Sequence, residues 1–414
     1  MQAELLTIGD ELLIGQIINT NSVWMAQKLN SIGVAVKQIT TVSDQKESII
    51  EAIDEALKRV DILLITGGLG PTKDDITKLA LCQYFNVGLK KEEKVIAFIK
   101  TNFLKRGIAF LPVHEGQALI LDNSDILFNH NGTAPGMWIN HNGKIIVCMP
   151  GVPFEMKGIM VNEVLPRISK QFKLPFIIHN TIVVFGMPES DVADNIALVE
   201  DNLPEHIKLA YLPNFGMVRV RLSGTGANEL KLRNEIDSYS SEIVRLLPSK
   251  HIGATNDFKL EEIIGQLMSA KNQTLAIAES CTGGYISHLI TSVPGSSAYF
   301  IGSLIAYSYQ VKTDMLGVSQ QTLLAYGAVS EECVKEMVLG IKNKVNSDFA
   351  ISTTGIAGPG GATNDKPIGT VWIAVAGPHG IETRKIMGNG ERINVIERTA
   401  MVALDMLRHM ILRN

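Results

Sequence analysis

Apolar runs alternate with helix-like segments along much of the chain, and this alternation restricts the fold more than any other feature. The apolar run at 3–8 precedes a helix-like segment that reaches Gly33, and runs at 34–42 and 61–66 flank a helix expected from 45 to 59. Strands that alternate with helices form a parallel sheet with helices on both faces. The sequence therefore predicts an α/β fold.

The alternation is interrupted once, so the chain divides into three expected domains. A length of 414 residues is too great for one core. We expect an α/β domain at 1–170, a small α+β domain at 171–250 and a second α/β domain at 251–414. In the middle domain, Arg219 and Arg221 share one strand face by period two, which indicates either a phosphate-binding face or a solvated edge strand.

One hairpin is predicted near the end of the first domain. Asn142-Gly143 lies between two apolar runs, and this dipeptide favours a type I′ turn.

Composition excludes several functional classes. The chain has 38 Lys and Arg residues and 42 Asp and Glu residues, which gives a net charge of −4. It has no block of consecutive basic residues that could bind along a nucleic-acid backbone. The four cysteines show no CxxC spacing, so neither a disulfide framework nor a zinc site is predicted. No stretch of about 18 apolar residues is present, and the N-terminus lacks the pattern of a signal peptide. We expect a cytoplasmic protein with no direct binding to nucleic acid or membrane.

A glycine-rich loop follows the buried strand at 61–66 and opens a helix. Parallel sheets bind ligands at the carboxyl ends of their strands, and glycine N–H groups can approach phosphate there. The loop matches neither a GxGxxG fingerprint nor a P-loop. Its candidate binding residues are Gly67, Gly68, Gly70 and Thr72.

Carboxylates beside this loop indicate a metal. Asp74 and Asp75 would repel a phosphate unless a cation lay between them, which predicts Mg²⁺ held by oxygen ligands. The alternative is that both residues cap the next helix. Other residues are expected to line the same cleft: Asp10 and Glu11 as further metal ligands, and Asn21, Gly151 and Glu155 as substrate ligands. Each of them is also compatible with ordinary turn chemistry.

The third domain carries a candidate nucleophile, Ser280, at a strand-turn-helix junction. Thr282, Gly283 and Gly284 follow it, and the glycines are expected to leave N–H groups free for an oxyanion hole. Lys312 is the candidate base, provided that desolvation lowers its pKa. The alternative for Lys312 is a solvated residue at a helix start.

Two further elements complete this candidate site. The glycine-rich stretch that follows another buried strand suits a phosphate or an amide, and Arg392 at the start of the last helix is a candidate phosphate ligand or a surface residue. Cys281 is the competing nucleophile, although lone cysteines more often pack. The candidate substrate-binding residues of the stretch are Thr354, Gly355, Gly358 and Gly360.

Several motifs of the third domain occur in the order found in one family. AESCTGG, AYSYQVK, GAVSEE, STTGIAGPGG, PIGTVW and GNGER resemble the C-terminal domain of the competence/damage-inducible protein CinA family. The resemblance implies a nicotinamide-nucleotide amidase that deamidates nicotinamide mononucleotide without a metal. It implies Ser280 as nucleophile, Lys312 as base, Tyr307 as a helper, Thr354 and its loop as substrate ligands, and Arg392 as phosphate ligand.

The first domain resembles the same family. TIGDELLIG, NTN, TGGLGPTKDD and MPGVPFE are similar to its molybdopterin-binding-like domain, a three-layer α/β fold. The resemblance implies either a pterin phosphate site or a Mg²⁺-dependent ADP-ribose pyrophosphatase with Asp75 in a catalytic role. We expect a bifunctional hydrolase of pyridine-nucleotide recycling that forms a homodimer. The alternative is a molybdopterin- or nucleotide-binding, competence-associated protein without turnover in the first domain.

Overall fold

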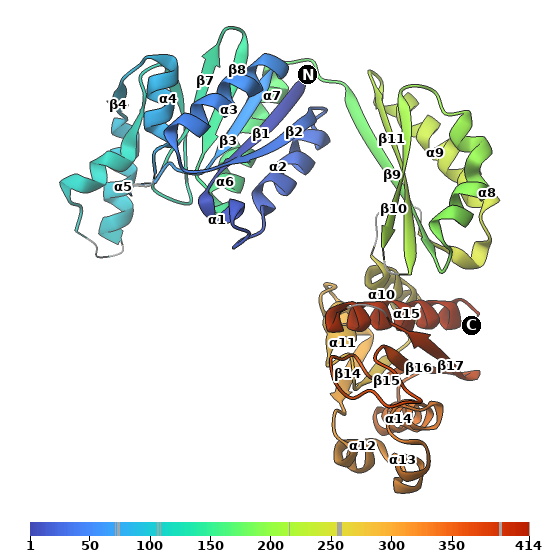
Figure 1. Ribbon diagram of the computed structural model, residues 1–414. Coiled ribbons are helices and arrows are strands. Elements are labelled where there is room, and N and C mark those ends of the chain that lie inside the picture. The colour runs from blue at the N-terminus through green and yellow to red at the C-terminus, as the bar shows by residue number, and fades with distance from the viewer. Residues whose placement is uncertain are drawn as a thin grey trace. The chain divides into compact units, whose positions relative to one another are not determined.

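The structure is a computed structural model (Figure 1) that describes residues 1–70, 72, 75–105, 107, 109–214, 216–254, 259–388 and 391–413. Contacts divide the chain into two compact units. One unit comprises Met1–Ile178 and Gly224–Arg233, and the other comprises His179–Ser223 and Asn234–Asn414. Asp74, a predicted metal ligand, lies outside the described residues. In the described part of the chain, no helix is long and apolar enough to span a membrane.

The N-terminal domain is built on a six-stranded sheet of order β2-β1-β3-β8-β7-β6. β1, β2, β3 and β8 are parallel, and β7 and β6 are antiparallel additions. Its strands are β1 (Gln2–Ile8), β2 (Ala35–Val42), β3 (Ile62–Thr66), β6 (Ser124–Leu127), β7 (Gly136–His141) and β8 (Lys144–Met149), and a separate pair is formed by β4 (Leu89–Lys91) and β5 (Leu119–Leu121).

Helices cover both faces of this sheet, which confirms the predicted three-layer α/β arrangement. Alternation along β1 sends Leu6 and Ile8 into a core with α3 and α4, and Ala3 and Leu5 into a core with α2, α6 and α7. The helices are α1 (Asp10–Leu13), α2 (Thr20–Ser31), α3 (Lys46–Arg59), α4 (Thr77–Phe85), α5 (Glu93–Lys105), α6 (Pro153–Ile159) and α7 (Leu165–Gln171), with a 3-10 segment at Pro112–Ala118 and a π-helical turn at Met160–Val164.

The predicted hairpin is confirmed. β7 and β8 pair in antiparallel register, and the turn residues Asn142 and Gly143 have φ of 50° and 78°. Two successive positive φ values are the signature of a type I′ turn.

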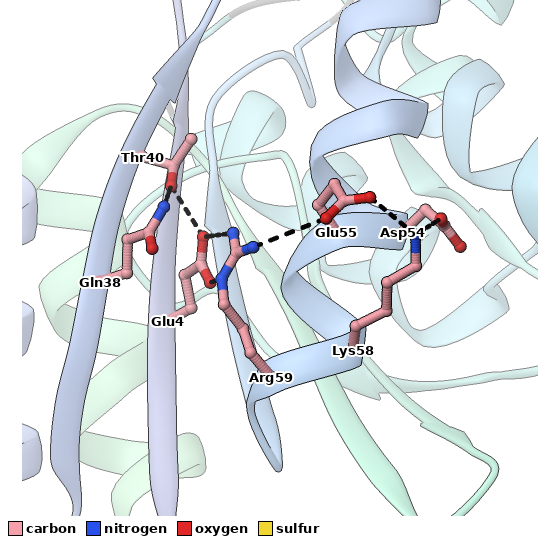
Figure 2. Close-up of polar contacts among 7 residues, drawn as sticks. All are labelled: Glu4, Gln38, Thr40, Asp54, Glu55, Lys58 and Arg59. Carbon is pink, nitrogen blue, oxygen red and sulfur yellow. Dashed lines mark hydrogen bonds and ion pairs between the residues drawn. The ribbon is translucent and has the colours of Figure 1, made fainter.

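One partly buried ion pair connects α3 to the sheet. Glu4 on β1 is fully buried, and its carboxylate accepts hydrogen bonds from Arg59 Nε at 2.7 Å and Nη2 at 2.8 Å. Thr40 on β2 donates to the same carboxylate at 2.7 Å. Figure 2 shows this network, which satisfies the buried charge of Glu4 with three donors.

The small α+β middle domain contains a four-stranded sheet of order β10-β11-β9-β12. Arg219 and Arg221 lie on β11, which has a neighbour on each side, so the edge-strand interpretation of these arginines is wrong. The elements are β9 (Phe176–Phe185), α8 (Glu189–Asp201), β10 (Ile207–Asn214), β11 (Met217–Gly226), α9 (Glu229–Leu246), a 3-10 turn (Ser249–His251) and β12 (Ile252–Ala254).

The C-terminal domain has a five-stranded sheet of order β14-β13-β15-β16-β17. β13 is parallel to β14 and β15, whereas β16 and β17 are antiparallel. Leu275 and Ile277 of β13 face a core with α10, α11 and α15, and Ala276 and Ala278 face α12, α13 and α14.

This second sheet is therefore covered on both faces, and it confirms the α/β prediction. The strands are β13 (Leu275–Glu279), β14 (Phe300–Ile305), β15 (Phe349–Gly355), β16 (Thr370–Gly377) and β17 (Gly380–Met387). The helices are α10 (Leu260–Ala270), α11 (Tyr285–Thr291), α12 (Tyr309–Leu316), α13 (Gln320–Tyr326), α14 (Glu331–Val345) and α15 (Arg392–Leu412), with a 3-10 turn at Ser296–Ala298.

Candidate functional site

Ser280 lies directly after the central strand β13, at the start of the turn that leads into α11. Its backbone N–H donates to the carbonyl of Thr353 on β15 at 3.0 Å, which fixes the end of the strand. Ser280 is 8% exposed, so it is largely protected from solvent.

The residue before the serine, Glu279, holds the turn in shape. It is fully buried, and its carboxylate accepts from the backbone N–H groups of Gly284, Ile286 and Ser287 at 2.9 to 3.2 Å and from the Ser287 hydroxyl at 2.6 Å. These are the N–H groups that a helix leaves unpaired in its first turn. Glu279 therefore caps α11, a role that no local sequence pattern indicates.

Lys312 lies beside Ser280. Its Nζ is 3.0 Å from Ser280 Oγ and 2.6 Å from the carbonyl oxygen of Ala306, and the side chain is 1% exposed. The lysine comes from the first turn of α12, which begins where the Ser308 hydroxyl accepts from the N–H of Val311. The solvated-lysine alternative is therefore wrong.

Burial shifts the protonation equilibrium of Lys312 toward the neutral amine. Desolvation lowers the pKa of Lys312 from its usual value, because the charged form loses its hydration. A lysine whose pKa is lowered is more often neutral near physiological pH, and a neutral amine can accept the serine proton.

The competing nucleophile, Cys281, is held in its thiol form. Cys281 is 5% exposed, and burial raises the pKa of its thiol to about 12. Because the thiolate is the nucleophile, such a pKa disfavours cysteine chemistry at neutral pH. Its side chain packs in the core with α10, α11 and α15.

The donors for an oxyanion differ from those that the sequence predicts. The N–H of Gly283 donates to the Ser280 carbonyl, and that of Gly284 donates to Glu279, so neither glycine is free. Within the described residues, no oxygen atom accepts from the N–H groups of Cys281 and Thr282. The Thr282 hydroxyl pairs with that of Thr353 at 2.8 Å. The available oxyanion donors are therefore the two amides that follow the serine.

Arg392 and Tyr307 form one side of the candidate site. Arg392 Nη2 donates to the Tyr307 hydroxyl at 2.8 Å, and Nη1 donates to the carbonyl of Gly358 at 2.7 Å. Tyr307 approaches Lys312 through its backbone carbonyl, at 3.4 Å, and not through its ring. Tyr307 thus positions the guanidinium of Arg392, which is exposed and able to meet an anion.

Thr354 and the loop after it have structural contacts of their own. The hydroxyl of Thr354, 1% exposed, donates to the carbonyl of Ala328 at 2.7 Å. Gly355 ends β15 where a side chain would strike the backbone of Thr370, whereas Gly360 has open space around it. The loop is therefore anchored at its start and open further along.

In the N-terminal domain, three predicted residues come together at the carboxyl ends of the parallel strands. The side-chain amide of Asn21 donates to the carbonyl of Gly151 at 2.7 Å. Gly151 packs against Gly67, where a Cβ would lie 3.4 Å from the Gly67 Cα. Gly67 also donates to the carbonyl of Met149 at 3.2 Å, which joins the loops after β3 and β8.

The predicted metal ligands do not form a cluster in the described part of the chain. Asp75 accepts from the N–H of Thr72 at 2.9 Å and from its hydroxyl, beside Gly70. Asp10 and Asp44 exchange backbone-to-carboxylate hydrogen bonds. Among the described residues, no group of three or more His, Cys, Asp or Glu side chains could hold a metal ion.

Two other carboxylates of the prediction have nearby partners. The carboxylate of Glu11 folds back over Gly9. Glu155 accepts from the side chain of Asn129 at 2.6 Å, close to Gly132. Neither contact joins these residues to Asp75.

Sequence reasoning missed Lys78, a buried lysine on the first turn of α4, beside the glycine loop. It is 8% exposed, and burial lowers its pKa to about 8 against the opposing effect of Asp75. No sequence signal marks it, because lysines at helix starts are usually solvated.

Three family models match the chain. They are the probable molybdopterin binding domain at 4–170, the damage-inducible protein CinA KH domain at 179–253 and the CinA C-terminal domain at 257–411. The middle domain is thus KH-like.

Relatives match along the whole chain. The CinA-like protein of Flavobacterium psychrophilum is 43% identical over 417 residues, which cover 100% of this chain and 99% of the relative. The CinA-like protein of Cytophaga hutchinsonii is 43% identical over 98% of this chain and 97% of its own. The crystal structure of competence/damage inducible protein CihA from Agrobacterium tumefaciens is 35% identical, covers 36% of this chain and 92% of its own, and has a TM-score of 0.36.

Proposed function

This chain belongs to the CinA family, and we propose that its C-terminal domain is an amidase that converts nicotinamide mononucleotide to nicotinate mononucleotide and ammonia. One observation carries the proposal: Lys312 Nζ lies 3.0 Å from Ser280 Oγ, and both side chains are buried. This is the geometry of a serine nucleophile with a lysine base.

The reaction follows from this geometry. Ser280 Oγ attacks the amide carbonyl carbon while Lys312 takes the hydroxyl proton. The N–H groups of Cys281 and Thr282 stabilise the oxyanion. The carbon–nitrogen bond then breaks, Lys312 returns the proton to the leaving nitrogen, and ammonia departs.

The resulting ester of Ser280 is hydrolysed in the second half of the reaction. Water attacks the acyl carbon as Lys312 accepts its proton, and that proton returns to Ser280 Oγ when the acid leaves. Arg392 would bind the phosphate of the mononucleotide, since its guanidinium is held by Tyr307 and Gly358 and remains exposed.

A product assay tests this activity. Full-length protein incubated with nicotinamide mononucleotide in EDTA should release ammonia and nicotinate mononucleotide in equal amounts. Folded protein that releases neither product would contradict the amidase and favour the binding-protein alternative.

For the N-terminal domain we propose binding and hydrolysis of the diphosphate in ADP-ribose, to AMP and ribose 5-phosphate. The convergence of Asn21, Gly67 and Gly151 at the carboxyl ends of β3 and β8 supports a ligand site there. The described carboxylates do not by themselves provide a Mg²⁺ site, so we derive no step through the metal.

Hydrolysis and binding without turnover are distinguished by AMP formation. AMP that appears from ADP-ribose with Mg²⁺ and disappears with EDTA would support the hydrolase. Binding of ADP-ribose without formation of AMP would contradict the hydrolase and favour the nucleotide-binding alternative.

A further inference from the structure

Lys78 is a buried cation for which no described residue supplies a counter-charge in contact. Its side chain is 8% exposed, and it has no hydrogen bond and no ion pair within the described part of the chain. Burial of an ammonium without a partner is unfavourable. The lowering of its pKa to about 8 is consistent with this desolvation.

Helix geometry gives the expected direction of the Lys78 side chain. Lys78 is the second residue of α4, and side chains on a helix tilt toward its N-terminus. Asp75, which lies in the loop, is the one carboxylate whose charge opposes the lowering of the Lys78 pKa. We therefore expect the ammonium near the start of α4, on the side of the glycine loop.

The start of α4 is fixed to the loop, and two of its N–H groups have no acceptor in the described part of the chain. The Thr77 hydroxyl donates to the Gly67 carbonyl at 2.9 Å, and the Thr77 N–H donates to the Gly68 carbonyl at 3.2 Å. Among the described residues, the N–H groups of Lys78 and Leu79 have no acceptor. A helix N-terminus with free amides and a positive dipole end is suited to an anion.

We propose that Lys78 is the cationic anchor of an anion site at the start of α4, where its ammonium and the amides of Lys78 and Leu79 bind a phosphate group of a nucleotide. This inference rests on the proposed function of the N-terminal domain and deepens it. A phosphate supplies the counter-charge that no described residue provides in contact with Lys78, and it accepts a charge-assisted hydrogen bond from the ammonium.

Calorimetric titration of the full-length chain with inorganic pyrophosphate, and separately with ADP, tests the site. All titrations contain EDTA and use an Arg392→Ala background, which removes the proposed phosphate ligand of the C-terminal domain. Lys78→Met keeps the apolar stem and removes the charge, so both anions should bind at least about tenfold more weakly. Lys78→Arg, which keeps the charge, should retain most of the affinity.

Lys58→Met is the matched control. Lys58 lies on α3 in the same domain, and its ammonium is already paired with Asp54 and Glu55 at the surface. This variant should bind both anions as its parent does. Thermal melting of every variant separates loss of the site from loss of the fold, and Lys78→Gln replaces Lys78→Met if the latter does not fold.

Unchanged affinity in the folded, charge-free variant would overturn the proposal, as would a parent protein that binds neither anion. The outcome is distinct from that of the hydrolase test. If the anions bind in a manner that depends on the charge of Lys78 but no AMP forms, only the hydrolase is contradicted. If AMP forms but Lys78→Met binds the anions with unchanged affinity, only the role of Lys78 is contradicted.

Discussion

Lys312 Nζ lies 3.0 Å from Ser280 Oγ, although 32 residues separate the two along the chain. The end of β13 presents the serine, and the first turn of α12 presents the lysine. The contact combines a protected nucleophile with a base whose pKa is lowered by burial. The predictions for the C-terminal domain follow from this pair.

The amidase rate should rise with pH. Lys312 is a base only when neutral, and its lowered pKa places the change of charge below the usual value of 10.5. We therefore expect log kcat/KM to increase by one per pH unit and then level off, with a midpoint below 10.5. A profile measured from pH 6 to 10 checks this, and a rate that falls as pH rises would contradict it.

Loss of the lysine amine should affect chemistry more than folding. Lys312→Met keeps most of the buried volume but removes the base, so kcat should fall by about 10²- to 10⁴-fold. Lys342→Met is the matched control, because Lys342 also donates to a backbone carbonyl, that of Ser347, at 2.9 Å. A control that lost as much activity as Lys312→Met would indicate a general packing effect.

Arg392 should act on binding of the phosphate. Arg392→Ala should raise KM for nicotinamide mononucleotide by roughly 10- to 100-fold with little change in kcat. Tyr307→Phe, which removes only the hydroxyl that positions Arg392, should have a smaller effect in the same direction. Nicotinamide riboside lacks the phosphate, so equal losses with this compound would argue against phosphate recognition.

Asp75→Asn should separate the two activities. The carboxylate of Asp75 organises the glycine loop through Thr72, so the variant should lose N-terminal hydrolysis and keep amidase activity. Parallel assays of AMP and ammonia on one preparation check this. Equal loss of both activities would contradict two independent sites.

Breaking the ion pair of Figure 2 should destabilise the N-terminal domain. Arg59→Met leaves the buried carboxylate of Glu4 without two of its three donors and without its counter-charge, at a cost of about 3 kcal/mol in unfolding free energy. In a Trp372→Phe background, the remaining tryptophans, Trp24 and Trp138, both report on this domain during urea unfolding. The double variant Glu4→Gln with Arg59→Met should recover part of the loss, and no recovery would mean that pairing is not the cause.

Local sequence patterns predicted much of the fold, because each pattern depends only on residues that are close together along the chain. The dipeptide Asn142-Gly143 predicted the hairpin, because a type I′ turn requires two positive φ values and these two residues tolerate them. Apolar runs that alternate with helix-like segments predicted the sheets covered on both faces. The place of β11 inside its sheet could not be predicted, because strand order depends on contacts between distant segments.

The candidate site was predictable in its residue types and less so in its geometry. The motif around Ser280 indicates a nucleophile, but only packing decides that α12 buries Lys312 beside it. The turn glycines suggested free amides, yet the buried carboxylate of Glu279 takes one of them. Lys78 gave no signal at all, because burial of a lysine depends on the elements that pack around it.

The most direct test of the account compares ammonia release from nicotinamide mononucleotide by the wild-type chain, Ser280→Ala and Cys281→Ala, all in EDTA. We predict that release persists in the wild-type chain and in Cys281→Ala and is abolished in Ser280→Ala. Release that survives in folded Ser280→Ala but is lost in Cys281→Ala would contradict the serine–lysine mechanism.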